Sequence, residues 1–158
     1  MGANTSQIPL QDKNATAMFA QQIARVLRPG DAILLEGAIG AGKTCFARAT
    51  IHALLDRQED VPSPTFTLVQ TYDTPKGEVW HCDLYRLTHP DEVFELGLDQ
   101  AFETAICLIE WPDRLGTDIP SDALRLFFEA RQDDHAVTLH MTPDRKSTRL
   151  NSSHVKRS

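Results

Sequence analysis

One eight-residue segment constrains this chain more than any other feature of its sequence. Residues 37–44 read Gly-Ala-Ile-Gly-Ala-Gly-Lys-Thr and match the pattern G-x-x-x-x-G-K-S/T at every fixed position. An apolar run at 32–35 precedes the segment, and a stretch with helical spacing of apolar residues follows it. This strand–loop–helix order predicts a phosphate-binding loop and disfavours the alternative, a glycine-rich turn with a chance lysine.

The chemistry of phosphate binding explains the spacing of that loop. Glycines allow successive backbone N–H groups to point inward at phosphate oxygens, and the following helix presents its positive N-terminal end. Lys43 can reach the β- and γ-phosphates of a nucleoside triphosphate, and Thr44 can offer its hydroxyl to Mg²⁺. We therefore expect nucleotide contacts from the whole loop and the residue after it: Gly37, Ala38, Ile39, Gly40, Ala41, Gly42, Lys43, Thr44 and Cys45.

Two acidic residues at expected strand ends are candidates to act on Mg²⁺ or on an attacking water, a role that such a loop requires. Glu110 follows the apolar run at 106–109, the usual layout of a Walker B carboxylate, and is the predicted metal ligand beside Thr44. Asp83 ends another expected strand and is a predicted catalytic residue together with Lys43. A solvated strand-end carboxylate is the alternative for each, and placement next to the loop favours function.

The spacing of apolar residues predicts the remaining elements. It predicts strands at 6–10, 32–35, 66–72, 78–84, 106–109, 124–129 and 136–141, with 66–72 and 78–84 forming a hairpin. It predicts helices from Asp12 or Asn14 to about Leu27, and at 43–55, 90–96 and 98–102. Alternating helices and apolar strands around the loop indicate a single-domain α/β protein with a mixed sheet flanked by helices.

Four further features each allow two interpretations. Ser-Pro-Thr at 63–65 can form a switch that senses a γ-phosphate, which makes Thr65 a candidate nucleotide contact; a proline-stiffened turn is the alternative. His81 can carry a proton, but a structural strand histidine is favoured. Trp80 and Trp111 are interpreted as core or interface anchors rather than as base-stacking platforms.

The cysteines and the apolar pattern bear on cellular location. Cys45, Cys82 and Cys107 are widely spaced among apolar neighbours, which predicts buried free thiols rather than a disulfide framework or a zinc site. No secretory signal and no run long enough to span a bilayer is visible. We expect a cytoplasmic protein without a membrane partner.

Four motifs together resemble those of the TsaE (YjeE-like) family. They are the loop, Ser-Pro-Thr-Phe-Thr-Leu-Val at 63–69, His-Cys-Asp-Leu-Tyr-Arg-Leu at 81–87, and Leu-Ile-Glu-Trp-Pro at 108–112. The resemblance covers roughly residues 8 to 142. The joint occurrence of the four motifs in this order is far more specific than the loop alone. The resemblance implies a small bacterial ATPase that uses ATP and Mg²⁺, is needed to make threonylcarbamoyladenosine in tRNA, and works with the TsaB and TsaD subunits.

The same resemblance carries over residue roles. By motif position, Lys43 would hold phosphate, Thr44 and Glu110 would hold Mg²⁺, and Asp83 would be a catalytic or switch carboxylate. Thr16 falls where the family has a threonine close to the nucleotide. The family also has an arginine before its last strand that approaches the nucleotide; here Arg131 or His135 substitutes for it, or the contact is absent.

Charge is distributed unevenly along the chain. The formal net charge is −6, and the last fourteen residues, 145–158, contain five Lys and Arg and no acid, so 1–144 carries −11. An acidic body is a poor stand-alone nucleic-acid binder because phosphate contacts need Lys and Arg, so we expect tRNA to be met only through the complex. We interpret 1–144 as the ATPase domain and 145–158 as vector read-through, with a native disordered basic arm for tRNA as the alternative.

Two rival functions share the same loop. A small-molecule P-loop kinase would normally add a lid with phosphate-clamping arginines, whereas the three arginines between 113 and 144 are spread out: Arg114, Arg125 and Arg131. A nucleotide-gated binding module with little turnover would share every motif with an ATPase that is weak alone and dependent on partners. The sequence does not separate these last two.

Overall fold

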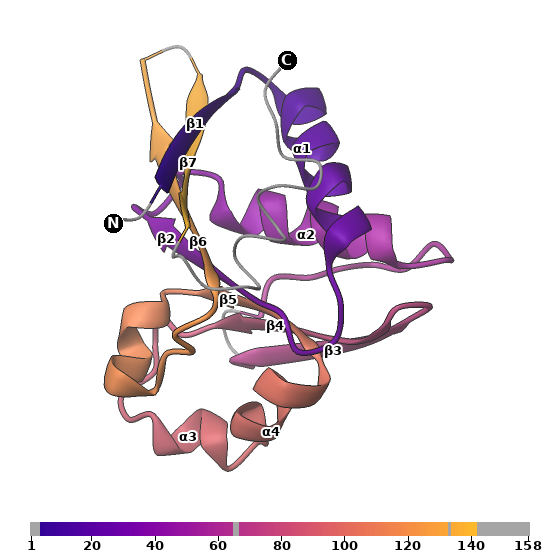
Figure 1. Ribbon diagram of the computed structural model, residues 1–158, viewed down its shortest axis with the longest axis vertical. Coiled ribbons are helices and arrows are strands. Elements are labelled where there is room, and N and C mark those ends of the chain that lie inside the picture. Colours follow the sequence, from indigo (N-terminus) through magenta and orange to yellow (C-terminus); the bar gives the residue numbers. More distant parts are fainter. Residues whose placement is uncertain (1–3, 65–66, 133, 142–158) are drawn as a thin grey trace.

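The computed structural model describes residues 4–64, 67–132 and 134–141, which form one seven-stranded sheet with helices on both faces (Figure 1). This confirms the expected single-domain α/β fold. Across the sheet, the strand order is β1-β7-β6-β2-β5-β4-β3. The strands are β1 Asn4–Leu10, β2 Ala32–Gly37, β3 Val69–Thr74, β4 Gly77–Asp83, β5 Ile106–Glu110, β6 Leu124–Ala130 and β7 His135–Met141.

The centre of the sheet is parallel and its margins are antiparallel. β2 pairs in parallel with both β5 and β6, and β4 pairs in parallel with β5. β3 is antiparallel to β4 at one margin, and β7 and β1 continue the other margin in antiparallel pairings. The central position of β2 explains its wholly apolar start, because a strand covered on both faces has no side exposed to water. The predicted mixed sheet is therefore confirmed.

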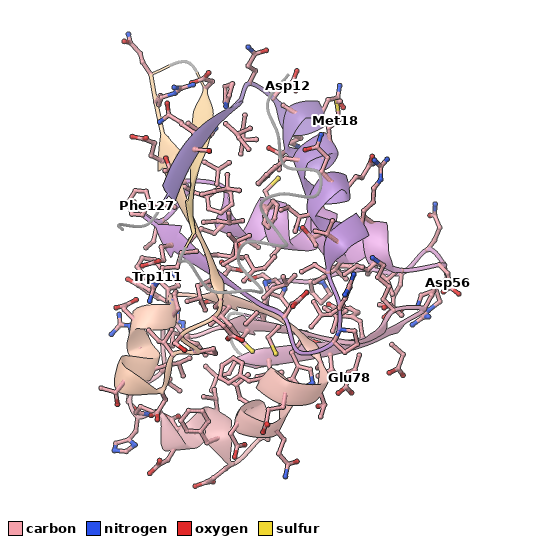
Figure 2. All side chains as sticks on the ribbon, in the orientation of Figure 1. Asp12, Met18, Asp56, Glu78, Trp111 and Phe127 are labelled. Carbon is pink, nitrogen blue, oxygen red and sulfur yellow. The ribbon has the colours of Figure 1, made fainter. Side chains whose placement is uncertain are left out.

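Two groups of helices cover the two faces. α1 (Lys13–Val26) and α2 (Lys43–Leu54) pack on one face, and α3 (Asp91–Phe94), α4 (Leu98–Thr104) and the 3-10 helix η1 (Pro112–Asp118) lie on the other (Figure 1). Alternate residues of a strand serve opposite faces: in β2, Ile33 and Leu35 join the core under α1 and α2, whereas Leu34 joins the other. Figure 2 shows side chains filling the space between the sheet and the helices on each face, with Met18 and Phe127 at the exposed surface.

Most element positions follow the sequence prediction, with a few differences. The Asp12 carboxylate caps α1 by accepting a hydrogen bond from the Ala15 N–H at 2.8 Å. β3 begins at Val69 rather than at residue 66, and Leu68 just before it has a left-handed backbone, with φ of 66°. Residue 66 lies outside the described residues. η1 was not predicted, because it is short and follows Pro112 in a stretch without helical spacing of apolar residues.

Within the described ranges, none of the helices combines the length and the hydropathy needed to cross a membrane.

Lys76, in the β3–β4 turn, connects that hairpin to the C-terminal end of α1. Its ammonium group donates to the carbonyl oxygens of Ala24, Arg25 and Leu27 at 2.8, 2.6 and 3.3 Å. The last carbonyls of a helix have no partner within the helix, and a cation there also opposes the negative end of the helix dipole. One side chain therefore caps α1 and fixes the hairpin against it.

We predict that Lys76→Met lowers the free energy of unfolding by about 1–2 kcal/mol, because carbonyls at the end of α1 lose a charged donor. Chemical denaturation measures the change. Lys13→Met, at the opposite end of the same helix, is the control and should change stability by less than about 0.5 kcal/mol. Equal effects of the two substitutions would contradict a capping role for Lys76.

Gly37, the last residue of β2, brings the loop into close contact with β6. It pairs with Phe128, and its φ of 134° lies in the region that favours glycine. A Cβ atom built on Gly37 would collide with the Phe128 carbonyl oxygen. Gly40, in the middle of the loop, also has a positive φ, of 83°, but a Cβ there would meet nothing within 4 Å.

We expect Gly37→Ala to destabilise the fold by at least about 3 kcal/mol, since backbone strain and a collision with main-chain atoms act together. Gly40→Ala should cost only about 1 kcal/mol, the penalty of the positive φ alone. Comparing the two midpoints of denaturation tests the difference. If Gly37→Ala were the milder substitution, the close approach to β6 would not be what requires glycine.

Candidate nucleotide site

The loop at 37–44 lies at the carboxyl end of β2 and leads directly into α2. Gly42, with φ of 111°, occupies the N-cap position of α2 and offers no side-chain cap to its first turn. The Ala41 N–H donates to the Ala38 carbonyl at 3.2 Å, which closes the loop into a tight turn. The loop therefore presents backbone N–H groups and the positive end of a twelve-residue helix at one point, as the phosphate motif requires.

Lys43 folds back over its own loop. Its ammonium group donates to the carbonyl oxygens of Gly37 and Ala38 and lies 3.8 Å from the centre of the Trp111 ring, a cation–π contact. The side chain is only 5% exposed. Burial lowers the pKa of Lys43, against the opposing attraction of Glu110, Asp83 and Asp113. A charge held at this cost beside a loop motif is typical of a functional residue.

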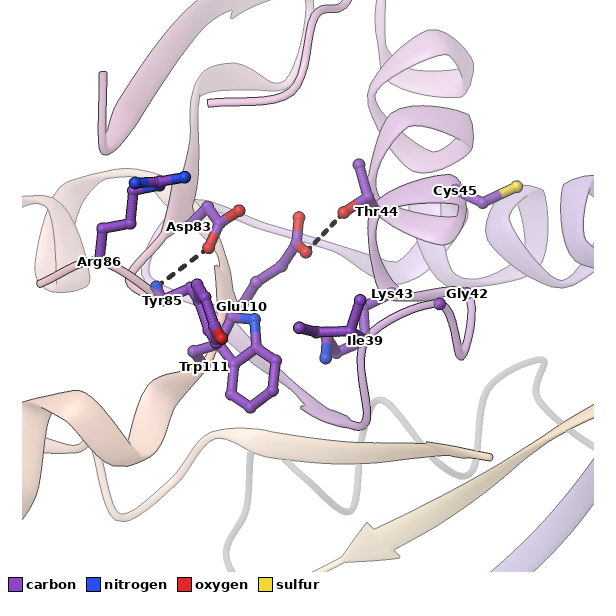
Figure 3. Close-up of a pocket in the computed structure, with 11 residues that line it drawn as sticks. Ile39, Gly42, Lys43, Thr44, Cys45, Asp83, Tyr85, Arg86, Glu110 and Trp111 are labelled. Atoms are coloured by element: carbon purple, nitrogen blue, oxygen red, sulfur yellow. Dashed lines mark hydrogen bonds between the residues drawn. The ribbon is translucent and has the colours of Figure 1, made fainter. Parts of the chain in front are cut away.

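Two carboxylates lie side by side opposite the loop. Asp83 ends β4 and Glu110 ends β5, and the parallel register pairs them directly. The Thr44 hydroxyl donates to Glu110 Oε1 at 2.6 Å, so the loop and β5 are joined at this point (Figure 3). Both carboxylates are buried, Glu110 to 2% exposure. The alternative of solvated strand-end carboxylates is therefore wrong for both residues.

Asp83 connects the site to the segment before β3. Its Oδ1 accepts a hydrogen bond from the Tyr85 N–H at 3.1 Å, and its own N–H donates to the Leu68 carbonyl at 2.9 Å. The left-handed Leu68 thus ties the end of the 63–68 segment to the backbone of a predicted catalytic residue. Thr65, the predicted nucleotide contact within that segment, lies outside the described residues.

His81 is a member of the site that the sequence did not reveal. It is fully buried, and its Nε2 lies 2.7 Å from Glu110 Oε2. The sequence favoured a structural strand histidine over a proton carrier. His81 and Asp83 stand two residues apart on β4, and so point to the same face of the sheet. This spacing could have indicated a contact between His81 and Glu110, but only with the knowledge that β5 lies next to β4 in the sheet.

Two cavities open on either side of the loop. The first, of about 480 Å³, is the site in Figure 3; it is bounded by the loop and α2, by the ends of β4 and β5, and by the rings of Tyr85 and Trp111. The second, of about 530 Å³, lies between the loop, the start of α1 and the β6–β7 connection. Thr16 lines this second cavity together with Gly40, Ala41 and Gly42. The structure therefore brings Thr16 to the loop, although the two are far apart in the sequence.

The sequence left open whether Arg131 or His135 replaces the family's C-terminal arginine, or whether that contact is absent. Arg131 and His135 both line the second cavity. The Arg131 guanidinium donates to both carboxylate oxygens of Asp134, at 2.8 and 2.9 Å, and these bonds raise the pKa of Arg131 and lower that of Asp134. The ion pair with Asp134, three residues further along the chain, therefore holds Arg131 at the cavity.

One cysteine prediction was wrong. All three thiols are free, and burial raises the pKa of Cys107 to about 12 and that of Cys82 well above its ordinary value. Cys45, however, is exposed and lines both cavities. On α2 the buried positions recur at helical spacing from Lys43 through Phe46 and Ala47, and Cys45 falls on the opposite side.

The donors at the first cavity fit Mg²⁺. Thr44 supplies a hydroxyl oxygen and Glu110 a carboxylate oxygen, hard donors of the kind that this ion prefers. In the described part of the chain there is no cluster of three or more His, Cys, Asp and Glu suited to a metal ion. A phosphate-linked Mg²⁺ does not need such a cluster, because phosphate oxygens and water complete its coordination.

Trp111 and Trp80 are placed differently. Both pack against the core on the face of α3 and α4, as predicted. Trp111 additionally lines the first cavity, has a left-handed backbone with φ of 58°, and contacts the Tyr85 ring at 4.9 Å between centroids. Its contact with Lys43 was not foreseen, because it depends on the position of the loop relative to the end of β5.

Comparison with known proteins agrees with this geometry. A family profile described as "Threonylcarbamoyl adenosine biosynthesis protein TsaE" matches residues 10–138. The chain is 39% identical over 129 residues to "tRNA threonylcarbamoyladenosine biosynthesis protein TsaE" of Rickettsia bellii, covering 82% of this chain and 90% of that one. It is 35% identical over 120 residues to the protein of the same name from Bacillus subtilis, covering 75% and 74% of the two chains.

A solved structure shares the fold. The crystal structure of Bacillus subtilis YdiB superposes with a TM-score of 0.78 at 26% sequence identity and covers 96% of this chain and 95% of that one. The profile match spans the loop, both carboxylates, His81 and Trp111. From the loop, the carboxylates and these matches together, the chain belongs to the TsaE family of threonylcarbamoyladenosine biosynthesis proteins.

Proposed function

We propose that this protein is a Mg²⁺-dependent ATPase subunit required for threonylcarbamoyladenosine modification of tRNA, acting in the cytoplasm with TsaB and TsaD. The observation that carries the proposal is the convergence of Lys43, Thr44, Asp83 and Glu110 around one cavity beside the phosphate-binding loop. The names of the Rickettsia bellii and Bacillus subtilis relatives support the pathway. The chemistry of the four residues supports the use of a nucleoside triphosphate.

Each of these residues has a task that suits its position. Loop N–H groups and Lys43 would bind the phosphates, with Lys43 exchanging its carbonyl and Trp111 contacts for phosphate oxygens. Thr44 and Glu110 would hold Mg²⁺, which when bound neutralises phosphate charge. Asp83, fixed by the Tyr85 N–H, would orient the attacking water and accept its proton.

The second cavity suits the remainder of the nucleotide. It adjoins the same loop glycines from the side of α1, and its lining combines loop residues with Thr16, Arg131 and His135. Phosphates in the loop would therefore leave the ribose and base within reach of Thr16 and of the Arg131–Asp134 pair. Both candidates to replace the family's C-terminal arginine, Arg131 and His135, line this cavity.

The surface around the first cavity favours a protein partner. Ile39, in the loop, is 73% exposed and Tyr85 is 42% exposed, and both line the cavity. The charge of −11 over 1–144 opposes direct binding of RNA. A partner that covers apolar groups at the mouth of the site would exclude water and complete it, so hydrolysis would depend on docking.

We predict that the isolated protein releases phosphate slowly from Mg·ATP and that added TsaB–TsaD raises the rate by at least about tenfold, as expected for a site completed by its partners. Lys43→Ala should lower the stimulated rate at least about a hundredfold, because transition-state charge loses its counter-ion. A phosphate-release assay with and without partners measures both.

The same assay separates the rival functions. Labelled ATP incubated with small-molecule acceptors would transfer label to an acceptor if the protein were a kinase. No stimulation by partners, together with normal function of the complex containing Lys43→Ala, would support a binding module and contradict the ATPase proposal.

Substitution of the two carboxylates should impair different steps, binding for Glu110 and turnover for Asp83. Glu110→Ala should weaken Mg²⁺-dependent nucleotide binding at least about tenfold, the loss of one charged contact of about 1.5 kcal/mol. Asp83→Ala should bind nucleotide normally and lose about a hundredfold in turnover. Calorimetry and phosphate release measure the two effects, with Glu103→Ala, at an exposed position of α4, as the control. Normal hydrolysis by Asp83→Ala would remove its catalytic role.

A further inference from the structure

His81 holds one oxygen of the Glu110 carboxylate from the interior of the sheet. Its Nε2 lies 2.7 Å from Oε2, while the Thr44 hydroxyl binds Oε1 at 2.6 Å. The histidine is 0% exposed and lines neither of the two cavities beside the loop. Glu110 is thus bound on one side by the loop helix and on the other by β4, and His81 has no direct access to a ligand.

Chemistry assigns the direction of the inner bond. When Glu110 is ionised its carboxylate only accepts hydrogen bonds, so Nε2 carries the hydrogen and donates a hydrogen bond to Oε2. A donor at each oxygen fixes the rotation of the carboxylate about its last bond. In metal sites, partners of this kind orient the ligand and set its basicity, and their loss typically costs roughly 10–100-fold in metal affinity.

The other ring nitrogen argues against a purely structural role. Nδ1 of His81 is buried, and none of the described residues makes a hydrogen bond with it. An unpaired buried polar atom costs about 1–3 kcal/mol, which an apolar side chain at the same position would avoid. The fold retains this cost at a strand position from which the side chain contacts Glu110.

We propose that His81 is a positioning residue that orients Glu110 for Mg²⁺. The inference rests on the proposed function, in which Glu110 is a metal ligand. His81 acts only through the carboxylate, so it should affect the metal-dependent part of nucleotide affinity and leave the metal-free part unchanged. Gln at this position can place an amide donor near Nε2, whereas Leu fills the space without a donor.

The test measures ADP and a non-hydrolysable ATP analogue by calorimetry, each with Mg²⁺ and with EDTA. His81→Leu should lose roughly 10–100-fold in affinity with Mg²⁺ and less than about threefold with EDTA, and His81→Gln should recover most of the loss. Mn²⁺ substituted for Mg²⁺ gives a second readout, because its electron paramagnetic resonance signal should broaden in His81→Leu and remain as in the wild type in His81→Gln.

Val79→Ala is the matched control. Val79 is buried on β4 two residues before His81, on the same face, so it tests general destabilisation without touching Glu110. It should keep the Mg²⁺ dependence of the wild type. If His81→Leu kept that dependence as well while folded, the positioning role would be wrong.

Two further outcomes keep the test decisive. If His81→Leu does not fold, ¹⁵N spectra of the labelled wild-type histidines replace it: the Nε2 signal missing from His81→Gln should shift with Mg²⁺ and nucleotide but not with nucleotide in EDTA. An unshifted signal would overturn the inference. If the wild type itself shows no Mg²⁺ dependence, the proposed function fails instead, and the two failures are thereby distinguished.

Discussion

A buried carboxylate at the end of β5 is the interaction on which the site depends. Removing Glu110 from water would cost several kcal/mol if it were unpaired, so its environment must supply donors. Those donors come from two different elements, Thr44 on α2 and His81 on β4, and Lys43 adds an opposite charge nearby. The carboxylate therefore fixes the distance between the loop helix and the strands opposite it, and the first cavity is the space that remains.

Sheet geometry brings these residues together. β2, β4 and β5 run in parallel, so the loop, Asp83 and Glu110 all lie at the same edge. On the other side, β6 approaches the loop so closely that Gly37 has no room for a side chain. The loop is thus supported from β6 and faces the carboxylates, and a shift of either neighbouring strand would change the shape of the site.

Short sequence patterns predicted the local features of the site, but they did not predict contacts between residues on neighbouring strands. The place of the loop between β2 and α2 and the positions of Glu110 and Asp83 at strand ends follow from short patterns and were confirmed, and of the two predicted caps, Asp12 and Asn14, the structure has Asp12. The bond from His81 and the contact of Trp111 with Lys43 require knowing that β4 and β2 flank β5, which no short pattern states. Cys45 was predicted to be buried because apolar residues lie near it in the sequence. It is exposed, because consecutive residues of a helix point in different directions. Thr65 stays a prediction.

The loop carbonyls and the Trp111 ring compete with any incoming anion for the ammonium group of Lys43. While the ammonium group of Lys43 is shared between loop carbonyls and the Trp111 ring, it is unavailable to an incoming anion. If the loop binds phosphate as proposed, only the fraction of molecules with a released Lys43 would bind it at full strength, and the apparent affinity would fall by that fraction. Under the proposed function, displacement of the Trp111 ring would therefore tighten phosphate binding without any contact with the ligand.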